Sequence, residues 1–375
     1  MITDTSTELV TTTSEGIAAV SLLRPDFEEY YLTVHPEGDG RSFDMFDKMR
    51  EFLAEKNATV LKQYVFGGCR LHGKGMKALA DACGPIDWPV TWLQGDACSG
   101  THLTGMQVYA IAGTPVGRIH LDGQCVGTTY EDDDAKYCLL GNLQETDTSL
   151  SRTEQARKTF EKMEEALAEA GMDFSNVVRT WLYLNDLLSW YDPFNVVRTQ
   201  FFEERGVFDR MVPASTGIGT SNPAEGALVT GLLAMKTKTD RIRIEEVPSP
   251  LQCPALDYRS SFSRAVQVSL PDHSKLYISG TASIDPDGNT IYIDDTAKQI
   301  AHTMKVVEGI LLSRGMDWNN TTRAIAYFKD TDDAPLLQDY CHKHGLPHML
   351  FAIAHSDVCR DDLLFELELD AMAVR

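Results

Sequence analysis

The sequence has no paired-cysteine motif, no histidine motif typical of a metal site and no glycine-rich nucleotide motif. Its eight cysteines are scattered, and no two have C-x-x-C spacing, so a zinc or thioredoxin-like site has no support. The ten histidines form no H-E-x-x-H pattern. No G-x-G-x-x-G turn opens a helix after a strand, and no Walker motif occurs. We therefore predict that the protein uses no cofactor and no metal.

The sequence also lacks long apolar runs and an excess of basic residues. No stretch approaches the ~18 apolar residues of a membrane-spanning helix. The first eight residues, Met-Ile-Thr-Asp-Thr-Ser-Thr-Glu, lack the basic and apolar regions of a signal peptide. We expect no membrane partner and a reducing, cytoplasmic location. The net charge of -21 repels nucleic acid, so we expect no nucleic-acid partner. A local arginine cluster can still hold a small anion.

A helix followed by a strand occurs three times along the 375 residues, which are enough for two or three domains. The copies span residues 42–66, 151–184 and 294–328. Each copy continues into a second helix that ends at a glycine, then a proline and an apolar strand. The clearest helix starts with the capping box Ser151-Arg-Thr-Glu154 and has its apolar residues at helical spacing. Such a repeat predicts a chain built from three similar units.

The repeat divides the chain into five segments. We expect a disordered tail at 1–15, a degenerate first unit at 16–113, a second unit at 116–238, a linker at 239–257 and a third unit at 258–375. Each unit is predicted to have the order ββαβαβ, an α+β fold with two helices on one face of a sheet. The other face needs cover. Three units around a pseudo-threefold axis would supply it within one chain, so we expect an intramolecular pseudo-trimer that is a monomer or weak homodimer.

The last predicted strand carries two acidic residues, Glu366 and Glu368, on one face. A carboxylate on an otherwise apolar strand is desolvated, which raises its pKa and suits a general acid near neutral pH. The alternative is a solvated strand edge or an ion pair with Arg360 or Arg323. Only the third unit has acidic residues on this strand.

Further candidates are arginines, a glycine-bearing segment and a cysteine. Arg179, Arg264 and Arg360 can bind carboxylates bidentately, although structural ion pairs are the commoner fate of arginine. The backbone N–H groups of Thr216-Gly217-Ile-Gly219 can hold a carboxylate, unless the glycines serve only a tight turn. Cys359 and His355 can form a nucleophilic pair, although a buried inert cysteine is more common.

Several motifs together resemble the RidA (YjgF) superfamily, whose single-domain members form homotrimers with ligand clefts between subunits. The resemblance covers almost the whole chain and is weakest in the first unit. Within the superfamily, four segments are similar to the FkbO/Hyg5-type chorismatases. These segments are Arg179-Thr-Trp-Leu-Tyr183, Pro213-Ala-Ser-Thr-Gly-Ile-Gly219, Leu276-Tyr-Ile-Ser-Gly-Thr-Ala282 and His355-Ser-Asp-Val-Cys-Arg-Asp-Asp-Leu-Leu-Phe-Glu-Leu-Glu368.

The sequence departs from the enamine/imine deaminases of that superfamily. These enzymes carry an arginine directly after the proline before their last strands, where this chain has Pro89-Val, Pro213-Ala and Pro347-His. They also use a tyrosine where this chain has Phe262. A Tyr-Gly-Pro-Arg-type segment of chorismatases is shortened here to 258–262, which bears on the substrate.

The resemblance implies a cofactor-free, chorismatase-like hydrolase of a small enol-ether or enamine carboxylate, which releases pyruvate. Glu366 would be the general acid, with Glu368 as the second catalytic candidate, in a cleft between the third and second units. The implied substrate-binding residues are Arg179, Tyr183, Thr216, Gly217, Gly219, Tyr258, Arg264, Ser279, Cys359 and Arg360. Two alternatives remain: a non-catalytic protein that binds a small anionic or enamine-type metabolite, and an enamine/imine deaminase, which the missing arginine disfavours.

Overall fold

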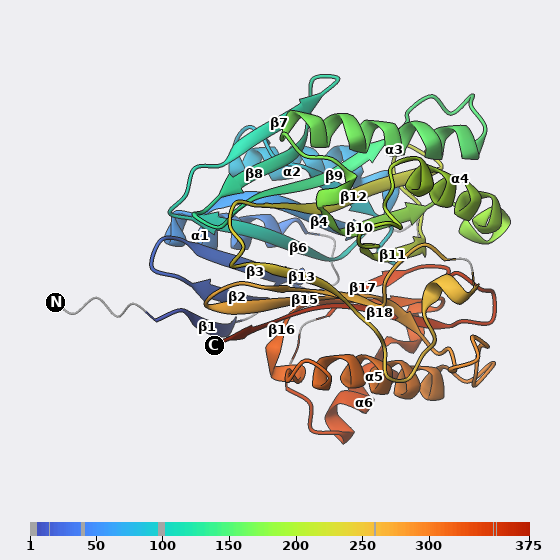
Figure 1. Ribbon diagram of the computed structural model, residues 1–375. Coiled ribbons are helices and arrows are strands. Elements are labelled where there is room, and N and C mark those ends of the chain that lie inside the picture. Colours follow the sequence, from blue (N-terminus) through green and yellow to red (C-terminus); the bar gives the residue numbers. More distant parts are fainter. Residues whose placement is uncertain are drawn as a thin grey trace.

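The chain folds into three six-stranded sheets, each covered by two helices (Figure 1). The computed structural model describes residues 6–14, 16–38, 42–96, 102–258, 260–347, 349 and 351–375. Within these ranges, none of the helices has the length and apolar character needed to cross a membrane.

The three sheets have the same strand order, which confirms the α+β fold of three repeated units. The first contains β1 (Glu8–Ser14), β2 (Ile17–Leu23), β3 (Glu28–Val34), β4 (Thr59–Gly67), β5 (Val90–Leu93) and β6 (Leu103–Ala112), ordered β1-β2-β3-β6-β4-β5. The second contains β7 (Gly117–Leu121), β8 (Gln124–Glu131), β9 (Ala135–Gln144), β10 (Val177–Leu184), β11 (Ala214–Gly219) and β12 (Leu228–Thr237). The third contains β13 (Arg243–Val247), β14 (Ala265–Ser269), β15 (His273–Ala282), β16 (Thr321–Phe328), β17 (Ala352–His355) and β18 (Phe365–Val374). We call these sheets, with their helices, the first, second and third units.

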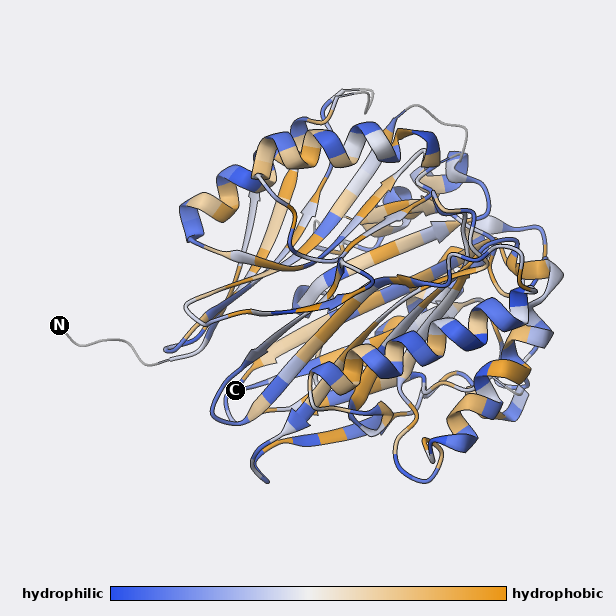
Figure 2. Cartoon of the chain, turned by 90° about the horizontal axis from the view of Figure 1, so that it is seen from above, coloured by the Kyte–Doolittle hydropathy of each residue, from blue (hydrophilic) through white to orange (hydrophobic). Residues whose placement is uncertain are grey.

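Six helices lie on the outside of the molecule. They are α1 (Asp44–Lys56), α2 (His72–Cys83), α3 (Arg152–Glu169), α4 (Tyr191–Glu204), α5 (Thr296–Leu312) and α6 (Ala334–Lys343). Figure 1 shows α3 and α4 at the top and α5 and α6 at the bottom, with the sheets between them. The predicted capping box at Ser151 is present, and the apolar stripe of α3 is fully buried. In Figure 2 the helices carry hydrophilic residues along their length, whereas the strands between them are rich in hydrophobic residues.

Each unit has two more strands than the predicted ββαβαβ order. The additional strands are an edge strand at the start of each unit and a short strand before the last one. β1 lies within the segment expected to be a tail and pairs with β2 over its whole length. Residues 1–5 and 15 of that segment lie outside the described residues. β13 lies within the expected linker and pairs with β14, so the third sheet begins at Arg243. Both predictions were wrong there because these edge strands bury few side chains and therefore lack an apolar alternation.

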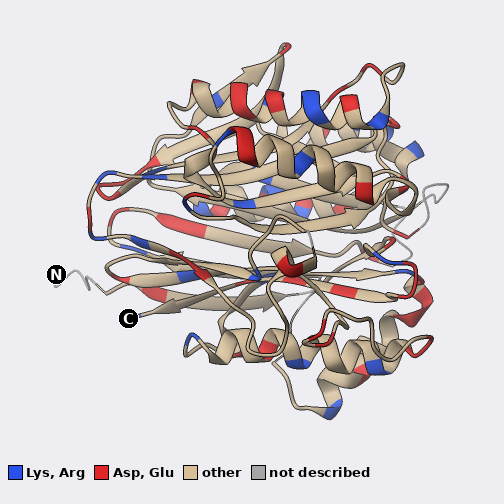
Figure 3. Cartoon of the chain, turned by 45° about the vertical axis from the view of Figure 1, so that its right-hand side comes forward, with Lys and Arg blue, Asp and Glu red and all other residues tan. Residues whose placement is uncertain are grey.

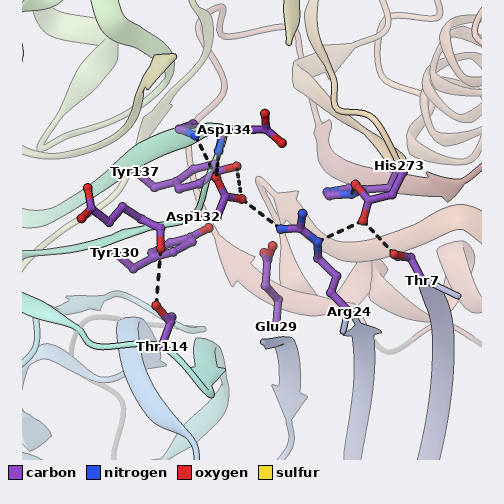
Figure 4. A network of polar contacts seen from close by, with 12 residues as sticks. Thr7, Arg24, Glu29, Thr114, Tyr130, Asp132, Asp134, Tyr137 and His273 are labelled. Atoms are coloured by element: carbon purple, nitrogen blue, oxygen red, sulfur yellow. Dashed lines mark hydrogen bonds and ion pairs between the residues drawn. The ribbon is translucent and has the colours of Figure 1, made fainter. Parts of the chain in front are cut away.

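The helix-free faces of the three sheets share one hydrophobic core, whereas each helix pair packs in a core of its own. β5 lies against β9, β11 against β15, and β17 against β6, so each unit contacts both others. The chain is therefore the expected intramolecular pseudo-trimer. At one point Arg24 of the first unit reaches both partners, 3.0 Å from Asp132 of the second and 3.0 Å from Asp272 of the third (Figure 4).

A bulge relates the three units residue by residue. Strand β4 pairs with β6, β10 with β12, and β16 with β18. In each pair the register shifts directly before a cationic residue, which is Lys62, Arg179 or Arg323, respectively. A bulge re-aims the side chain that follows it. These three cationic residues therefore occupy equivalent positions and are directed toward the shared core.

Candidate active site

A small cavity lies between the second and third units, where the sequence analysis placed the functional cleft. It measures about 30 Å³. The second unit contributes α4 and β11, and the third contributes β15, β18 and the segment before β14. Its polar wall includes Glu366, Arg198, Arg264, Tyr191 and Tyr258.

Glu366 reaches this cavity because β18 alternates between two environments. Leu367 and Leu369 pack under α5, whereas Glu366 points to the opposite face and is 5% exposed. The carboxylate lies directly over Gly280, where a β-carbon would come 2.0 Å from its Oε1 atom. Among the described residues, no group donates a hydrogen bond to it. Burial and the negative charge of Glu368 raise the pKa of Glu366 to about 8, against the opposing charges of Arg179 and Arg264. Glu366 is thus mostly protonated at neutral pH.

Glu368 has the opposite surroundings, inside an ion-pair network. The Trp181 indole donates a hydrogen bond of 3.0 Å to Oε1, and the Tyr327 hydroxyl donates one of 3.2 Å to Oε2. Arg323 also donates to Oε1, and Arg179 lies 3.5 Å from Oε2. Burial opposes ionisation, but these two guanidinium groups hold the pKa of Glu368 below its usual range. The ion-pair alternative therefore describes Glu368, which is a fixed carboxylate and not a proton donor.

The three candidate arginines lie in different places. Arg264 lines the cavity, where its Nε and one terminal nitrogen donate hydrogen bonds of 2.9 and 2.8 Å to the Cys253 carbonyl. Arg179 is fully buried behind the cavity, with its terminal nitrogen 2.7 Å from the Thr216 hydroxyl. Arg360 donates to the Gly288 carbonyl and lies against the Tyr258 ring, outside the cavity lining. Of these three candidates, only Arg264 lines the same cavity as Glu366.

A second cavity arginine, Arg198, was not a candidate from sequence. It is 1% exposed on α4, its terminal nitrogen donates to Asn195 at 2.7 Å, and its buried Nε has no hydrogen-bond partner. A detectable signal existed, because Arg198 interrupts the buried stripe of α4 formed by Phe194, Phe201 and Phe202. A charged residue at such a position is expensive unless it meets a partner or a ligand.

The glycine-bearing segment forms a strand and not an anion-binding turn. Thr216, Gly217 and Gly219 lie in β11, which pairs in parallel with β10, and none of them has a left-handed φ. Gly217 lines the cavity. Gly219 exchanges backbone hydrogen bonds of 2.7 and 2.9 Å with Asp357, so its N–H group is not available to a ligand. The Thr216 hydroxyl accepts hydrogen bonds from Arg179 and from the Gly280 N–H group. Thr216 therefore connects the two units behind the cavity.

Ser279 and Tyr183 lie outside the cavity lining. The Ser279 hydroxyl accepts from the Ser215 N–H group at 2.9 Å and donates to the Ser263 carbonyl, so it joins the second unit to the third. Tyr183 is fully buried in the shared core. The family resemblance placed both near the cleft but could not distinguish cavity walls from the contacts behind them.

Cys359 lines the cavity but does not pair with His355. Burial and the charge of Glu366 raise the pKa of the Cys359 thiol to about 12, so the reactive thiolate is scarce at neutral pH. His355 instead places Nδ1 2.9 Å from the Gln94 amide of the first unit. The nucleophilic-pair hypothesis was therefore wrong.

Tyr258 separates the cavity from a larger groove of about 890 Å³ on the outer side of α4, and its side chain lines both. The groove includes Leu256, Val196 and Phe208. The Thr199 and Ser261 hydroxyls, 2.8 Å apart, line this groove and connect α4 to the third unit. The cavity alone is too small for a ligand of more than a few atoms.

Only one of the three inter-unit clefts has an acidic residue at this position of the last strand. Tyr327 pairs with Glu366, and the corresponding residues of the other units, Tyr183 and Phe66, pair with Val229 and Gly105. Figure 3 shows how few charged residues the strands carry compared with the helices and loops.

Comparisons with known proteins agree with this architecture. Residues 117–234 match the family described as "Chorismatase FkbO/Hyg5-like, N-terminal". The chain is 28% identical to a 3-hydroxybenzoate synthase of Streptomyces hygroscopicus over 276 residues, which cover 66% of this chain and 76% of that protein. It is 26% identical to a chorismatase of Streptomyces rapamycinicus over 220 residues, 52% of this chain and 64% of that one. In sequence, this chain is therefore similar to chorismatase-type proteins.

The fold of a chorismatase-type protein is also seen in a solved structure. A chorismatase crystal structure superposes with a TM-score of 0.60 at 18% identity, covering 84% of this chain and 93% of that one. The match therefore extends across all three units. The matched family region ends within β12, ahead of the third unit that carries Glu366.

Proposed function

We propose that the protein is a cofactor-free hydrolase that cleaves the enol ether of chorismate and releases pyruvate. The observation that carries this proposal is the state of Glu366: a buried, mostly protonated carboxyl group that faces two arginines across a small cavity. A general acid has to hold its proton at the working pH, and a pKa of about 8 satisfies that condition. The named relatives, a chorismatase and a 3-hydroxybenzoate synthase, support the choice of substrate.

The chemistry begins with proton transfer to carbon. Glu366 delivers its proton to the methylene carbon of the enolpyruvyl group, and the adjacent carbon becomes an oxocarbenium ion. Water adds to that carbon, and the Glu366 carboxylate takes the proton that the water loses. The resulting hemiketal breaks its bond to the ring oxygen, which leaves with the hemiketal proton as an alcohol. Chorismate and water thus become pyruvate and a dihydroxylated cyclohexadiene carboxylate.

Two cationic residues suit the carboxylate of the enolpyruvyl group. Arg264 and Arg198 lie on the cavity wall, and Arg198 has a buried N–H group without a partner. A guanidinium binds a carboxylate through parallel hydrogen bonds. One water molecule occupies roughly 10–15 Å³ of cavity volume. A cavity of about 30 Å³ therefore holds only a small part of a substrate. The ring then extends past Tyr258 into the outer groove.

The 28%-identical 3-hydroxybenzoate synthase favours a second candidate outcome. The same first protonation and loss of pyruvate can end in an aromatic ring that keeps one hydroxyl group, if the dihydroxylated ring then loses its other hydroxyl group and a ring proton as water. Both routes release pyruvate, and they differ in the ring product.

The test is pyruvate release from chorismate by the purified protein, with the ring product identified by chromatography. We expect release by the wild type, loss of at least ~10²-fold in Glu366→Gln, and near-normal release by Glu161→Gln, which changes an exposed carboxylate on α3. A folded wild-type protein that binds chorismate without releasing pyruvate would refute the hydrolase and favour the non-catalytic binding protein.

Because the three helix-free sheet faces already cover one another, we propose a monomer or weak homodimer, which light scattering after size exclusion can test. We also propose a reducing, cytoplasmic location, as expected from the scattered cysteines of the sequence.

A further inference from the structure

A second cavity lies in the core shared by the three units and has no lining residue in common with the Glu366 cavity. It measures about 50 Å³. Its polar lining includes Lys62 and Tyr64 of the first unit and Arg323 and Asp370 of the third, with Trp181 of the second unit beside them. We call it the axial cavity.

Lys62 enters the axial cavity without a partner. Its side chain is 4% exposed, and its Nζ atom makes no hydrogen bond within the described part of the chain. The Nζ atom lies 3.8 Å from the Trp181 ring centroid and 4.8 Å from the Tyr64 ring centroid. These π faces attract an ammonium group but supply no hydrogen-bond acceptor of ordinary strength. An ammonium has three donors, so an acceptor is missing.

The charges around Lys62 do not balance. Its equivalents in the other units, Arg179 and Arg323, both contact Glu368, and Arg323 also lies 2.8 Å from Asp370. The two carboxylates therefore serve three cations. The nearby pair of Glu29 and Lys275 is complete in itself, with 2.6 and 2.7 Å contacts. Buried charges are normally paired, so a protonated Lys62 would lack a negative charge of its own.

We propose that the axial cavity binds a small monovalent anion, such as formate or a halide, through Lys62. One water molecule occupies roughly 10–15 Å³ of cavity volume. The cavity of about 50 Å³ therefore accepts an ion of up to about four non-hydrogen atoms. An empty cavity favours the neutral amine, because burial and the charge of Arg323 lower the pKa of Lys62. A bound anion raises the pKa of Lys62 again, because its negative charge favours the ammonium form. The anion therefore binds together with a proton. Because all three units build the cavity, the bound ion stabilises their assembly.

The test compares thermal unfolding in sodium formate for the wild type, Lys62→Met and Lys77→Met. Lys77 is an exposed lysine of α2, so its variant controls for the loss of one positive charge. We expect a saturable rise of the wild-type Tm by a few degrees, the same rise in Lys77→Met, and no saturable rise in Lys62→Met. An identical response of wild type and Lys62→Met would overturn the proposal.

Diffraction gives a measurement that needs no folded variant. Wild-type crystals soaked in sodium bromide should show an anomalous peak within hydrogen-bonding distance of Lys62 Nζ. A cavity that contains only water under these conditions refutes the site. The result is independent of the proposed hydrolase, since Glu366→Gln should retain both the formate response and the bromide peak.

Discussion

Glu366 and Glu368 project from the same face of β18, but only Glu368 is paired. Two guanidinium groups, an indole and a phenol surround Glu368, whereas Glu366 faces a cavity with no hydrogen-bond donor bound to it among the described residues. The fixed negative charge of Glu368 contributes to the raised pKa of Glu366. The negative charge of Glu368 thus helps to keep Glu366 protonated.

The pH dependence of catalysis should follow Glu366. Its ionisation removes the proton that the reaction needs, so kcat/KM for pyruvate release should be constant through neutral pH and fall tenfold per pH unit above about 8. Initial rates between pH 6 and 10 measure this. A rate that stays constant to pH 10 would show that Glu366 is not the acid.

Gly280→Ala should inactivate the enzyme without unfolding it. The new β-carbon would lie 2.0 Å from Glu366 Oε1, so the carboxyl group must move away from its position. We expect kcat to fall by ~10²-fold, as for other misplaced catalytic groups. Gly73→Ala is the matched control, because a β-carbon there meets nothing within 4 Å. It should leave kcat unchanged and slightly stabilise α2. Equal kcat values in both variants would contradict the proposed position of the acid.

Arg198→Met should weaken binding of a substrate carboxylate. The unpartnered Nε group of Arg198 lies in the cavity wall, whereas Arg360 donates to a backbone carbonyl outside it. We expect kcat/KM to fall by roughly 10²-fold for Arg198→Met, equivalent to about 3 kcal/mol, and by much less for Arg360→Met. Steady-state kinetics on both proteins test this. A larger effect at Arg360 would show that the substrate carboxylate binds on the other side of Tyr258.

Lys275→Met should destabilise the junction of the first and third units. Lys275 contacts both oxygens of Glu29, which is 1% exposed. Burial opposes ionisation of Glu29, but Lys275 lowers its pKa to about 2. The pair therefore contributes stability above pH 4.5 that is lost as the pH falls toward 2.

Removing one partner of such a buried pair costs about 3–5 kcal/mol. Denaturant unfolding at pH 7 should give this loss for Lys275→Met, and most of it should be regained when Glu29→Gln is added. If the double variant is no more stable than Lys275→Met, the uncompensated Glu29 charge is not the cause.

The repeat and the acidic strand could be read from the sequence because both depend on local patterns. Helix caps and apolar stripes recur at similar spacing, and Glu366 stands out in an otherwise apolar strand. β1 and β13 could not be recognised in this way. Their side chains are mostly exposed, and these strands exist because a neighbouring strand offers its backbone groups.

The sequence by itself determined three repeated α+β units, the single unit that carries a carboxylate strand, and the acidic surface. Only the tertiary structure decided which glutamate holds a proton, because pairing with Arg323 and Arg179 depends on residues that are distant in sequence. It also decided that Arg198 faces the cavity, that Gly219 does not bind a ligand, and that Lys62 lies unpaired in the axial cavity. Charge, burial and hydrogen bonding at these positions arise between units, and no local pattern encodes them.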